Sequence, residues 1–334
     1  MKLCYINRKF LPGVGGAQEF ASSTVNILKK TGINLDLIVN KKGNKYMPIF
    51  FIEALFKILF SKSDIYHTGD GLTAILNPII KIFKRKPIVT TVLGLDITHK
   101  NRLYQKIIIP CVNLSDKIIS ISEETKKECK KRGISQNKII VINPGLDLGK
   151  YPQSKVTKDK NMMITVGRQV ERKGINLFVR GKLNQLMKDN PNLNFHIIGD
   201  GPESEKIKET ISQSKYKDRI FLHGRISDNE VYNYYLKSKF FVMPNIYVEG
   251  DIEGFGLVIL EAIFFENIIL ANPIEGIKDA LKYTSNWIDL KKEKIILDDI
   301  KYKKESNDLS WDNRIKEYLK IYRIKAFHPV CDWW

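Results

Sequence analysis

The apolar positions of this 334-residue chain fall into short runs separated by longer segments of mixed polarity. Most runs in the first half are uninterrupted, which is typical of strands buried on both faces of a parallel sheet. These predicted strands read KLCYIN, LDLIV, DIYHTG, PIVTTVLG, KIISIS and KIIVINPG. The segments between them have helical length, near residues 17–30, 49–60, 72–83 and 123–132. The alternation predicts a doubly wound α/β domain.

The same alternation starts again after a polar, lysine-rich stretch at residues 148–160, which we interpret as a linker. The predicted strands here read MMITVG, NFHIIG, RIFLHG, FFVMPN and NIILAN, with helices near 174–188, 203–213, 228–237 and 256–265. We therefore expect two Rossmann-like domains, residues 1–150 and 155–310, with a cleft between them. Ligands of such sheets bind beyond the carboxyl ends of the strands, so the strand-to-helix turns should carry the function.

Composition narrows the class of protein. A hydrophobic fraction of 43% without low-complexity tracts indicates a globular chain. The longest apolar segment, Pro48 to Phe60, is interrupted by Glu53 and Lys57 and does not predict a membrane span. The N-terminal sequence MKLCYINRKF has no apolar segment of signal-peptide length. The four cysteines have no paired spacing, which predicts neither a zinc site nor a disulfide framework and favours a reducing, cytoplasmic compartment.

The net charge of +18 is unevenly placed. Residues 1–150 hold 25 lysines and arginines against 11 acidic residues, a net charge of +14, and the rest of the chain has a net charge of only +4. A basic first half predicts an anionic partner, which could be a lipid surface, a phosphorylated acceptor or nucleic acid. The alternative is a lysine-rich surface that serves solubility alone.

Two basic residues follow the predicted strand MMITVG. Arg168 and Lys173 lie in the segment VGRQVERKG, a turn bounded by glycines. A diphosphate needs charge-assisted donors of this kind, so we expect the two cations to bind one; ordinary surface basic residues are the alternative. Gly201, in the turn after NFHIIG, and Gly224, at the end of RIFLHG, are candidates for backbone contacts with a donor and its nucleobase.

The segment EGDIEGFGLVILEA at 249–262 joins acidic residues and glycines to an apolar run. A glycine-rich turn before a helix leaves backbone N–H groups free to bind phosphate or sugar hydroxyls. Glu253 would accept hydrogen bonds from a sugar, and Glu261, two turns on, from a ribose diol. On one helix the two residues would lie about 12 Å apart, whereas a hydrolytic pair needs roughly 5–9.5 Å. The alternative is a buried helix whose glutamates are merely solvated.

The first half offers further candidates at its strand ends. Gly15 and Gly16, in FLPGVGGAQEF, let the backbone approach a ligand closely. His67 and Asp70, in DIYHTGDGL, could face the cleft as catalytic groups, and Asp96, in TTVLGLDITHK, lies on the acceptor side. A structural hydrogen-bonding role is the alternative for His67.

Six segments, in order along the chain, resemble motifs of the retaining family-4 glycosyltransferases, which are also called glycosyl transferases group 1. They are GGAQ at 15–18, SISEET at 120–125, NPGLD at 143–147, VGRQVERKG at 166–174, IIGDGPE at 197–203 and EGFGLVILEA at 253–262. The resemblance covers almost the whole chain and implies a GT-B fold with two facing Rossmann-like domains. SWDNRIKEYLKIYR at 310–323 is similar to the last helix of the family, which crosses back to the first domain at about 311–325.

This resemblance implies that the second domain binds a UDP- or GDP-linked sugar and that the first domain binds the acceptor. Arg168 and Lys173 would neutralise the diphosphate, on which Gly16 closes. Glu253 and the backbone of residues 255–257 (Phe255, Gly256 and Leu257) would hold the sugar, and Glu261 the ribose. The resemblance further implies hexose transfer with retention of the anomeric configuration, by front-side attack and without a metal ion or other cofactor.

Two positions depart from the family pattern. Leu93 stands where many members have a histidine near the donor sugar, so that contribution is missing or comes from His67 or Asp70. Glu275-Gly276 replaces the usual double glycine. The ending AFHPVCDWW matches no segment of the family and is either a small aromatic membrane contact or a tail.

The acceptor has to be inferred from the first domain. KKGNKYMPIFFIEALFKILFSK and NPIIKIFKRKP mix apolar residues with lysines, which suits docking on an anionic membrane leaflet. The alternative is that both are sheet-covering helices whose lysines point outward. We expect a peripheral enzyme of the inner membrane face that adds a hexose to a glycan or lipid-linked acceptor of the cell envelope.

Two other function classes remain as alternatives. A nicotinamide-dependent Rossmann enzyme would use the first glycine turn, but Gln18 stands where the third glycine of the fingerprint is needed. A non-catalytic nucleic-acid-binding protein would explain the charge, but the chain has no recognisable aromatic-rich motif for nucleic acid, and we expect no such partner.

Overall fold

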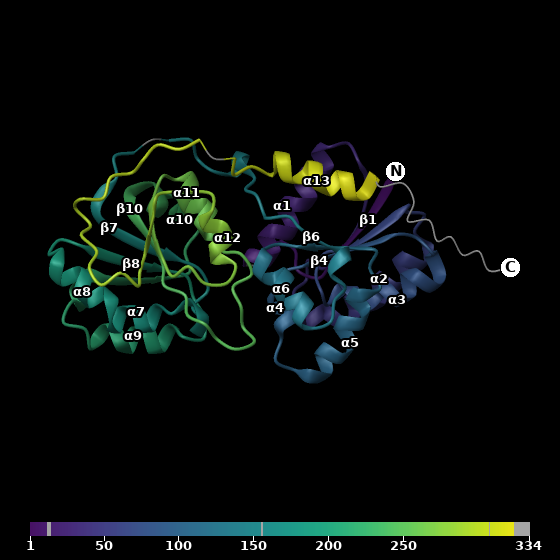
Figure 1. Ribbon diagram of the computed structural model, residues 1–334, viewed down its shortest axis with the longest axis horizontal. Helices are drawn as coiled ribbons and strands as arrows, with labels where there is room; N and C mark the ends of the chain where they lie inside the picture. The colour runs from purple at the N-terminus through teal and green to yellow at the C-terminus, as the bar shows by residue number, and fades with distance from the viewer. Residues whose placement is uncertain (12–14, 155, 307, 324–334) are drawn as a thin grey trace. The chain divides into compact units, whose positions relative to one another are not determined.

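The computed structural model describes residues 1–11, 15–154, 156–306 and 308–323, and the chain forms two compact units (Figure 1). Unit 1 comprises Met1–Asp147 and the chain from Ser310 onward, and unit 2 comprises Leu148–Leu309. The boundary therefore falls at the start of the segment interpreted as a linker. The ending AFHPVCDWW lies outside the described residues.

Unit 1 is built on a parallel six-stranded sheet with the order β2-β1-β3-β4-β5-β6. Its strands are β1 (Lys2–Asn7), β2 (Asn34–Val39), β3 (Ile65–Thr68), β4 (Ile88–Val92), β5 (Lys117–Ser120) and β6 (Ile139–Val141). The direction of winding reverses between β1 and β3, and the turns beyond their carboxyl ends are where such a sheet binds ligands.

The longer helices of unit 1 are α1 (Gly16–Lys30), α2 (Met47–Phe60), α5 (Arg102–Asn113), α6 (Glu123–Lys131) and α13 (Trp311–Arg323). α13 packs against α1 through Trp311 and Phe20, whose ring centroids are 5.5 Å apart. The chain returns to this unit where Leu146 and Ser310 form an isolated parallel bridge. α13 therefore belongs to the first unit although it follows the second in sequence.

The helix predicted at 72–83 forms as three short turns. A 3-10 turn at Thr73–Leu76 leads into α3 (Asn77–Ile79) and then into a π-helical turn, η3 (Ile80–Lys84). Pro78 has no N–H to donate to the carbonyl four residues earlier, so a continuous α-helix through this position would lack a bond. A further short helix, α4 (Leu95–Thr98), follows β4.

Unit 2 has a second parallel six-stranded sheet with the order β12-β11-β10-β7-β8-β9. Its strands are β7 (Asp159–Val166), β8 (Asn194–Ile198), β9 (Ile220–Gly224), β10 (Ser238–Met243), β11 (Ile268–Ala271) and β12 (Trp287–Asp289). Winding reverses between β7 and β10, so the turns after these two strands form the expected ligand-binding edge. The two sheets confirm the predicted doubly wound α/β class.

The second unit also contains α-helices among its described residues. They are α7 (Ile175–Arg180), α8 (Lys182–Asp189), α9 (Ser204–Ser212), α10 (Asp228–Lys237), α11 (Leu257–Phe264) and α12 (Ile277–Leu281). The single helix predicted at 174–188 is two helices, because the chain turns at Gly181, which has φ −114° and ψ −95°. No helix among the described residues of either unit has the length and apolar character needed to span a bilayer.

Candidate functional site

The turns after β7 and β10 contact each other through their backbones. The N–H of Ile246 donates to the carbonyl of Arg172 at 2.9 Å. Gly174, which caps α7 in a left-handed conformation with φ 64°, lies so close that a Cβ there would stand 2.2 Å from the carbonyl oxygen of Pro244. Glycine is therefore required, and the contact fixes where Arg172 and Lys173 project at the sheet edge.

Glu253 and Lys173 form a close ion pair at this edge. Lys173 Nζ lies 2.6 Å from Glu253 Oε2, and the amide of Asn245 donates to the same oxygen at 3.1 Å. Arg172 Nη2 lies 3.7 Å away. Burial alone would raise the pKa of Glu253, but Lys173, Arg172 and the two hydrogen bonds outweigh it and lower the pKa. The site therefore holds an ionised carboxylate between two cations, and two residues predicted to act on different parts of a donor are brought together.

Arg168 differs from Lys173 in its surroundings. Its side chain is exposed, and it makes no hydrogen bond or ion pair with any residue that the structure describes. The next residue, Gln169, is fully buried, and its amide donates to the carbonyl of Gly199 at 2.7 Å. Sequence reasoning did not select Gln169, although its place in the glycine-bounded turn was a signal. Gln169 holds the turns after β7 and β8 together and leaves Arg168 directed to solvent.

Gly201 permits this close approach. A Cβ at Gly201 would lie 2.3 Å from the carbonyl oxygen of Gln169. The N–H of Gly201 donates to Asp200 Oδ1 at 2.7 Å and to Ser204 Oγ at 2.9 Å. Gly224 ends β9 with φ 64°, and its carbonyl accepts from Gly199 N–H at 2.8 Å. Both glycines therefore shape the edge, and their predicted contacts with a donor stay predictions.

The turn after β11 supports Glu253 from another side. The N–H of Glu253 donates to Glu275 Oε2 at 2.6 Å, and its carbonyl accepts from Gly276 N–H at 3.1 Å. A Cβ at Gly276 would lie 2.2 Å from the carbonyl oxygen of Gly254. Glu275, noted in the sequence only as a departure from a double glycine, is thus a buried neighbour of Glu253 with φ 47°.

α11 begins at Leu257, after Gly256, which has φ 91° and no side-chain cap. Phe255 is buried. The backbone of residues 255–257 therefore lies at the start of the helix, and its predicted role in sugar binding stays a prediction. Glu253 lies before the helix, so the 12 Å separation that assumed both glutamates on one helix does not apply.

Glu261 lies on α11 and contacts two tyrosines. Tyr235 Oη donates to Glu261 Oε2 at 3.0 Å, and Tyr151 Oη donates to Oε1 at 3.3 Å. Burial, followed by the charge of Glu261, raises the pKa of Tyr235. Neither tyrosine was selected from the sequence, because they lie far from Glu261 along the chain. The tyrosines fix the carboxylate on the helix.

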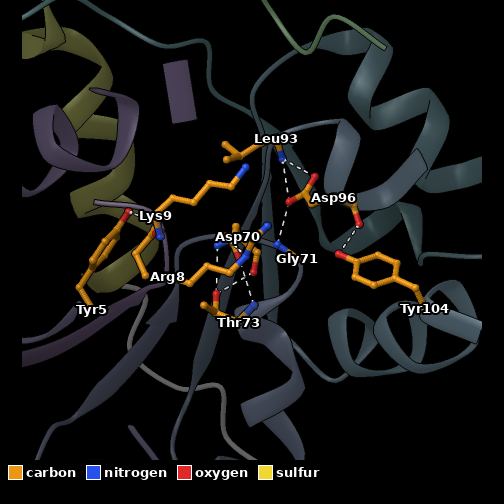
Figure 2. Close-up of polar contacts among 10 residues, drawn as sticks. Tyr5, Arg8, Lys9, Asp70, Gly71, Thr73, Leu93, Asp96 and Tyr104 are labelled. Atoms are coloured by element: carbon orange, nitrogen blue, oxygen red, sulfur yellow. Dashed lines mark hydrogen bonds and ion pairs between the residues drawn. The ribbon is translucent and has the colours of Figure 1, made fainter. Parts of the chain in front are cut away.

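Unit 1 has a second group of strand-end carboxylates, drawn in Figure 2. Asp70, after β3, accepts from Thr73 N–H at 2.8 Å and lies 2.9 Å from Arg8 Nε, which follows β1. Asp96 accepts from Gly71 N–H at 2.7 Å and from Leu93 N–H at 2.9 Å. These bonds tie the turn after β3 to the turn after β4.

Both carboxylates of this group are buried. Burial, and then the nearby charge of Asp70, raise the pKa of Asp96 to about 6. Tyr104 Oη donates to the backbone carbonyl of Asp96 at 3.1 Å. Arg8 was not selected from the sequence, although two basic residues directly after a first buried strand were a usable signal. The structure gives Asp70 and Asp96 roles in holding the turns, and their predicted roles toward a substrate stay predictions.

The expectation that His67 faces a ligand is not met, because His67 lies in the core of unit 1. Side chains alternate along β3: Tyr66 joins the core beneath α2, and His67 points to the face that α13 covers. His67 Nδ1 lies 2.5 Å from Tyr322 Oη, and Nε2 lies 2.8 Å from Thr91 Oγ1. Burial lowers the pKa of His67 to about 3. A neutral, fully buried imidazole with both nitrogens occupied has a structural role.

The predicted glycine turn of unit 1 is only partly described. Gly13 lies outside the described residues. Gly15 has φ 132° and precedes the first residue of α1, Gly16, and the carbonyl of Gly15 accepts from the N–H groups of Gln18 and Glu19 at 3.1 Å. The start of α1 is thus a backbone turn with no side-chain cap, and the predicted donor contact of Gly15 and Gly16 stays a prediction.

Comparison with known proteins identifies the family of the chain. Residues 14–150 match the family described as Glycosyltransferase Family 4, and residues 150–319 match Glycosyl transferases group 1. An uncharacterized glycosyltransferase of Methanocaldococcus jannaschii is 23% identical over 303 residues, covering 79% of this chain and 76% of the relative. One subunit of the human phosphatidylinositol N-acetylglucosaminyltransferase is 20% identical over 313 residues, covering 84% of this chain and 63% of the relative.

Solved structures agree on the fold. The Anabaena protein HepE, in complex with UDP and glucose, has a TM-score of 0.64 and 16% identity, covering 84% of this chain and 82% of that chain. The two doubly wound parallel sheets of the chain match the GT-B fold. The chain belongs to glycosyltransferase family 4 of the glycosyl transferases group 1, as its motifs predicted, and it is a glycosyltransferase. Family membership argues against the nicotinamide and nucleic-acid alternatives.

Proposed function

We propose that the protein transfers a hexose, with retention of configuration, from a UDP- or GDP-linked donor to a glycan or lipid-linked acceptor in cell-envelope polysaccharide or glycolipid synthesis. The observation that carries this proposal is the Lys173–Glu253 pair at the winding reversal of unit 2, with the exposed guanidinium of Arg168 in the same turn. HepE, which shares the fold, binds UDP and glucose, and this supports a nucleotide-sugar donor.

The donor would lie along the strand ends of unit 2. Arg168 is available to a diphosphate, and Lys173 would divide its charge between that diphosphate and Glu253. Glu253, ionised and held by Asn245, can accept hydrogen bonds from sugar hydroxyls. The N–H groups at the start of α11 would complete the sugar site, and Glu261, held by two tyrosines, would accept from the ribose.

In the proposed reaction an acceptor hydroxyl oxygen forms a bond to the anomeric carbon as the bond to the β-phosphate oxygen breaks on the same face. The acceptor proton moves to the departing phosphate, whose charge Arg168 and Lys173 stabilise. We propose that these cations replace a metal ion, so that neither a metal nor another cofactor takes part. Asp70 and Asp96 would hold the acceptor-side turns of unit 1.

The acceptor is proposed to be reached at the membrane. The human relative is named for transfer to phosphatidylinositol, a lipid, which supports a lipid-linked acceptor. The basic first half of the chain supports an anionic surface as partner. We propose a cytoplasmic enzyme that works on the inner face of the cell membrane.

A thermal-shift screen tests the donor site. UDP, GDP, ADP and their common sugar conjugates are added to the full chain in the presence of a chelator. We expect one nucleotide to raise the melting temperature, and the rise to be lost in Lys173→Ala and Glu261→Gln but kept in Lys188→Ala, an exposed lysine of the same unit. A folded wild-type chain that responds to none of these ligands would contradict the proposal.

Product analysis tests the stereochemistry of transfer, and turnover in the presence of a chelator tests whether a metal ion is needed. Once the donor is known, the anomeric configuration of the product distinguishes retention from inversion. Turnover that persists in chelator supports the metal-free reaction, and turnover that needs an added divalent cation overturns it.

A further inference from the structure

The outward face of α2 is apolar although it is exposed. Phe50, Ala54 and Ile58 bury the inner face of the helix in the core of unit 1. The exposed apolar residues on the other side are Ile49 at 50%, Ile52 and Phe56 at 58%, and Phe60 at 81% exposure. Their spacing places them along one stripe of the helix, opposite the core face. Sheet-covering helices normally direct polar side chains outward, so this stripe needs another explanation.

A neighbouring turn extends the apolar surface. η3 contacts α2 and exposes Ile82 and Phe83, each at 66%. Lys84, at the end of η3, donates from Nζ to the carbonyls of Leu59 and Ser61 at 2.8 Å, which ties η3 to the end of α2. Both elements lie in unit 1, where α2 and α3 are labelled in Figure 1. We define the α2–η3 face by these exposed residues: Ile49, Ile52, Phe56, Phe60, Ile82 and Phe83.

Several exposed lysine and arginine residues lie in or directly after α2 and η3, the elements that form the α2–η3 face. Lys57, Lys62, Arg85 and Lys86 are exposed, and none makes an ion pair with a residue that the structure describes. Lys81, in contrast, is paired with Asp116 at 2.7 Å. Glu53 is the single acidic residue among residues 47–62. The surface therefore combines large apolar side chains with uncompensated positive charge.

We propose that the α2–η3 face docks the protein on an anionic lipid bilayer. Apolar side chains of this size enter the boundary between headgroups and acyl chains, and the surrounding cations bind anionic headgroups. A second copy of the chain would bring like charges together, so charge complementarity favours an anionic surface as the occupant. The outward isoleucine and phenylalanine side chains support membrane docking over the alternative in which only lysines point outward.

This inference deepens the proposed function, since it names the surface from which a lipid-linked acceptor is taken. It depends on exposed residues of unit 1 alone, whereas the donor site lies in unit 2. The two proposals can therefore fail independently.

Co-sedimentation of the full chain with liposomes tests the docking. Vesicles of phosphatidylcholine alone are compared with vesicles that also contain phosphatidylglycerol, at low and high salt. We expect binding to the anionic vesicles that weakens in high salt. Phe60→Ser with Phe83→Ser should reduce the partition coefficient at least about tenfold, because two inserted rings are lost. Lys57→Glu with Lys62→Glu should reduce it by a similar factor through charge.

Two matched controls lie in unit 2: Leu177→Ser at a 55% exposed leucine and Lys188→Glu at an exposed lysine. Both should bind vesicles like wild type. Wild-type binding that the Phe60 and Phe83 changes leave intact would overturn the proposal, as would salt-independent binding to neutral vesicles. Absence of vesicle binding, with a dimer in light scattering that Phe60→Ser dissolves, would also overturn it. The nucleotide-induced thermal shift of the variants reports the donor site separately.

Discussion

The two units share an architecture but hold their strand-end carboxylates in different ways. In unit 1, Asp96 accepts from the backbone N–H groups of Gly71 and Leu93, so its partners cannot change unless the turns move. In unit 2, the carboxylate of Glu253 is held by the side chains of Lys173 and Asn245 rather than by backbone groups. A charged ligand can therefore compete with Glu253 for Lys173, whereas the partners of Asp96 belong to the backbone of the turns. Asp96 in unit 1 therefore has rigid backbone support, whereas the charge of Glu253 in unit 2 is balanced by side chains.

The two parts of the chain also differ in net charge and in exposed apolar surface. The first 150 residues have a net charge of +14 and include the exposed apolar α2–η3 face, whereas the rest of the chain is close to neutral. The surface that we propose for membrane docking and the site that we propose for a nucleotide-sugar donor thus lie in different units of the chain. Substitutions at matched positions in the two units test this difference.

Removing the cation that pairs with Glu253 in unit 2 should have the largest effect on the unfolding free energy. Lys173→Ala leaves the buried carboxylate of Glu253 with the amide of Asn245 and the more distant cation Arg172, and breaking a buried ion pair costs about 3–5 kcal/mol of unfolding free energy. Urea denaturation measures this loss, and glycosyl transfer should fall with it. Lys127→Ala, which breaks an exposed pair with Glu124 in unit 1, should cost less than about 1 kcal/mol. Equal costs for the two substitutions would refute the contrast.

Asp96→Asn tests the rigid support in unit 1 by its pH dependence. The folded pKa of Asp96 is about 6 against the usual 3.8, so between these values the folded chain keeps a proton that the unfolded chain has lost. This contribution to stability is complete below pH 3.8 and is lost as the pH rises through 6, a change of about 3 kcal/mol. The unfolding free energy of wild type minus that of Asp96→Asn should therefore grow as the pH falls from 7 to 4.

The contribution of His67 to the stability of unit 1 changes with pH in the opposite direction to that of Asp96. Its folded pKa is about 3 against the usual 6.5, so its contribution is lost as the pH falls below 6.5. Because both variants being compared retain His67, its effect cancels from the difference. A difference between wild type and Asp96→Asn that stays constant across this pH range would show that the Asp96 pKa is not raised.

Gly276→Ala should have an intermediate effect confined to unit 2. Its Cβ would lie 2.2 Å from the carbonyl oxygen of Gly254, so the segment that carries Glu253 must move, at about 1–3 kcal/mol. Gly181→Ala, where the nearest atom is the Leu177 carbonyl oxygen at 3.3 Å, is the matched control and should cost less. Denaturation gives both values, and donor binding should weaken only in Gly276→Ala.

The smallest effect is expected on the α2–η3 face. Phe60 is 81% exposed, so Phe60→Ala should change the unfolding free energy by less than about 0.5 kcal/mol. Phe50→Ala, on the buried face of the same helix, should cost about 3–5 kcal/mol. A large cost at Phe60 in urea denaturation would mean that its ring packs within unit 1 and is not free to enter a bilayer.

Much of the fold followed from the local pattern. Buried parallel strands read as uninterrupted apolar runs, so the runs KLCYIN and MMITVG located β1 and β7 and the turns that follow them. The glycines that bound residues 166–174 likewise predicted the turn after β7 that carries Arg168 and Lys173. The prediction of one helix at 72–83 was wrong in detail, because Pro78 interrupts the backbone hydrogen bonds of a continuous α-helix.

Partners that meet across the fold could not be predicted from that pattern. His67 lies 2.5 Å from Tyr322, which is 255 residues away, and only the return of α13 to unit 1 makes that contact. Lys173 and Glu253 are 80 residues apart and meet because β7 and β10 are neighbours in the sheet. The outward face of α2 was likewise undecided, because apolar residues occur on more than one side of the helix and their burial depends on what covers them.

The amino-acid sequence by itself determined two doubly wound units, the turns at their strand ends and the family to which they belong, since these depend on residues close together along the chain. Only the tertiary structure decided that His67 is buried, that Glu253 is paired and that Phe60 is exposed. The physical reason is that burial and pairing depend on groups brought together by the packing of distant segments.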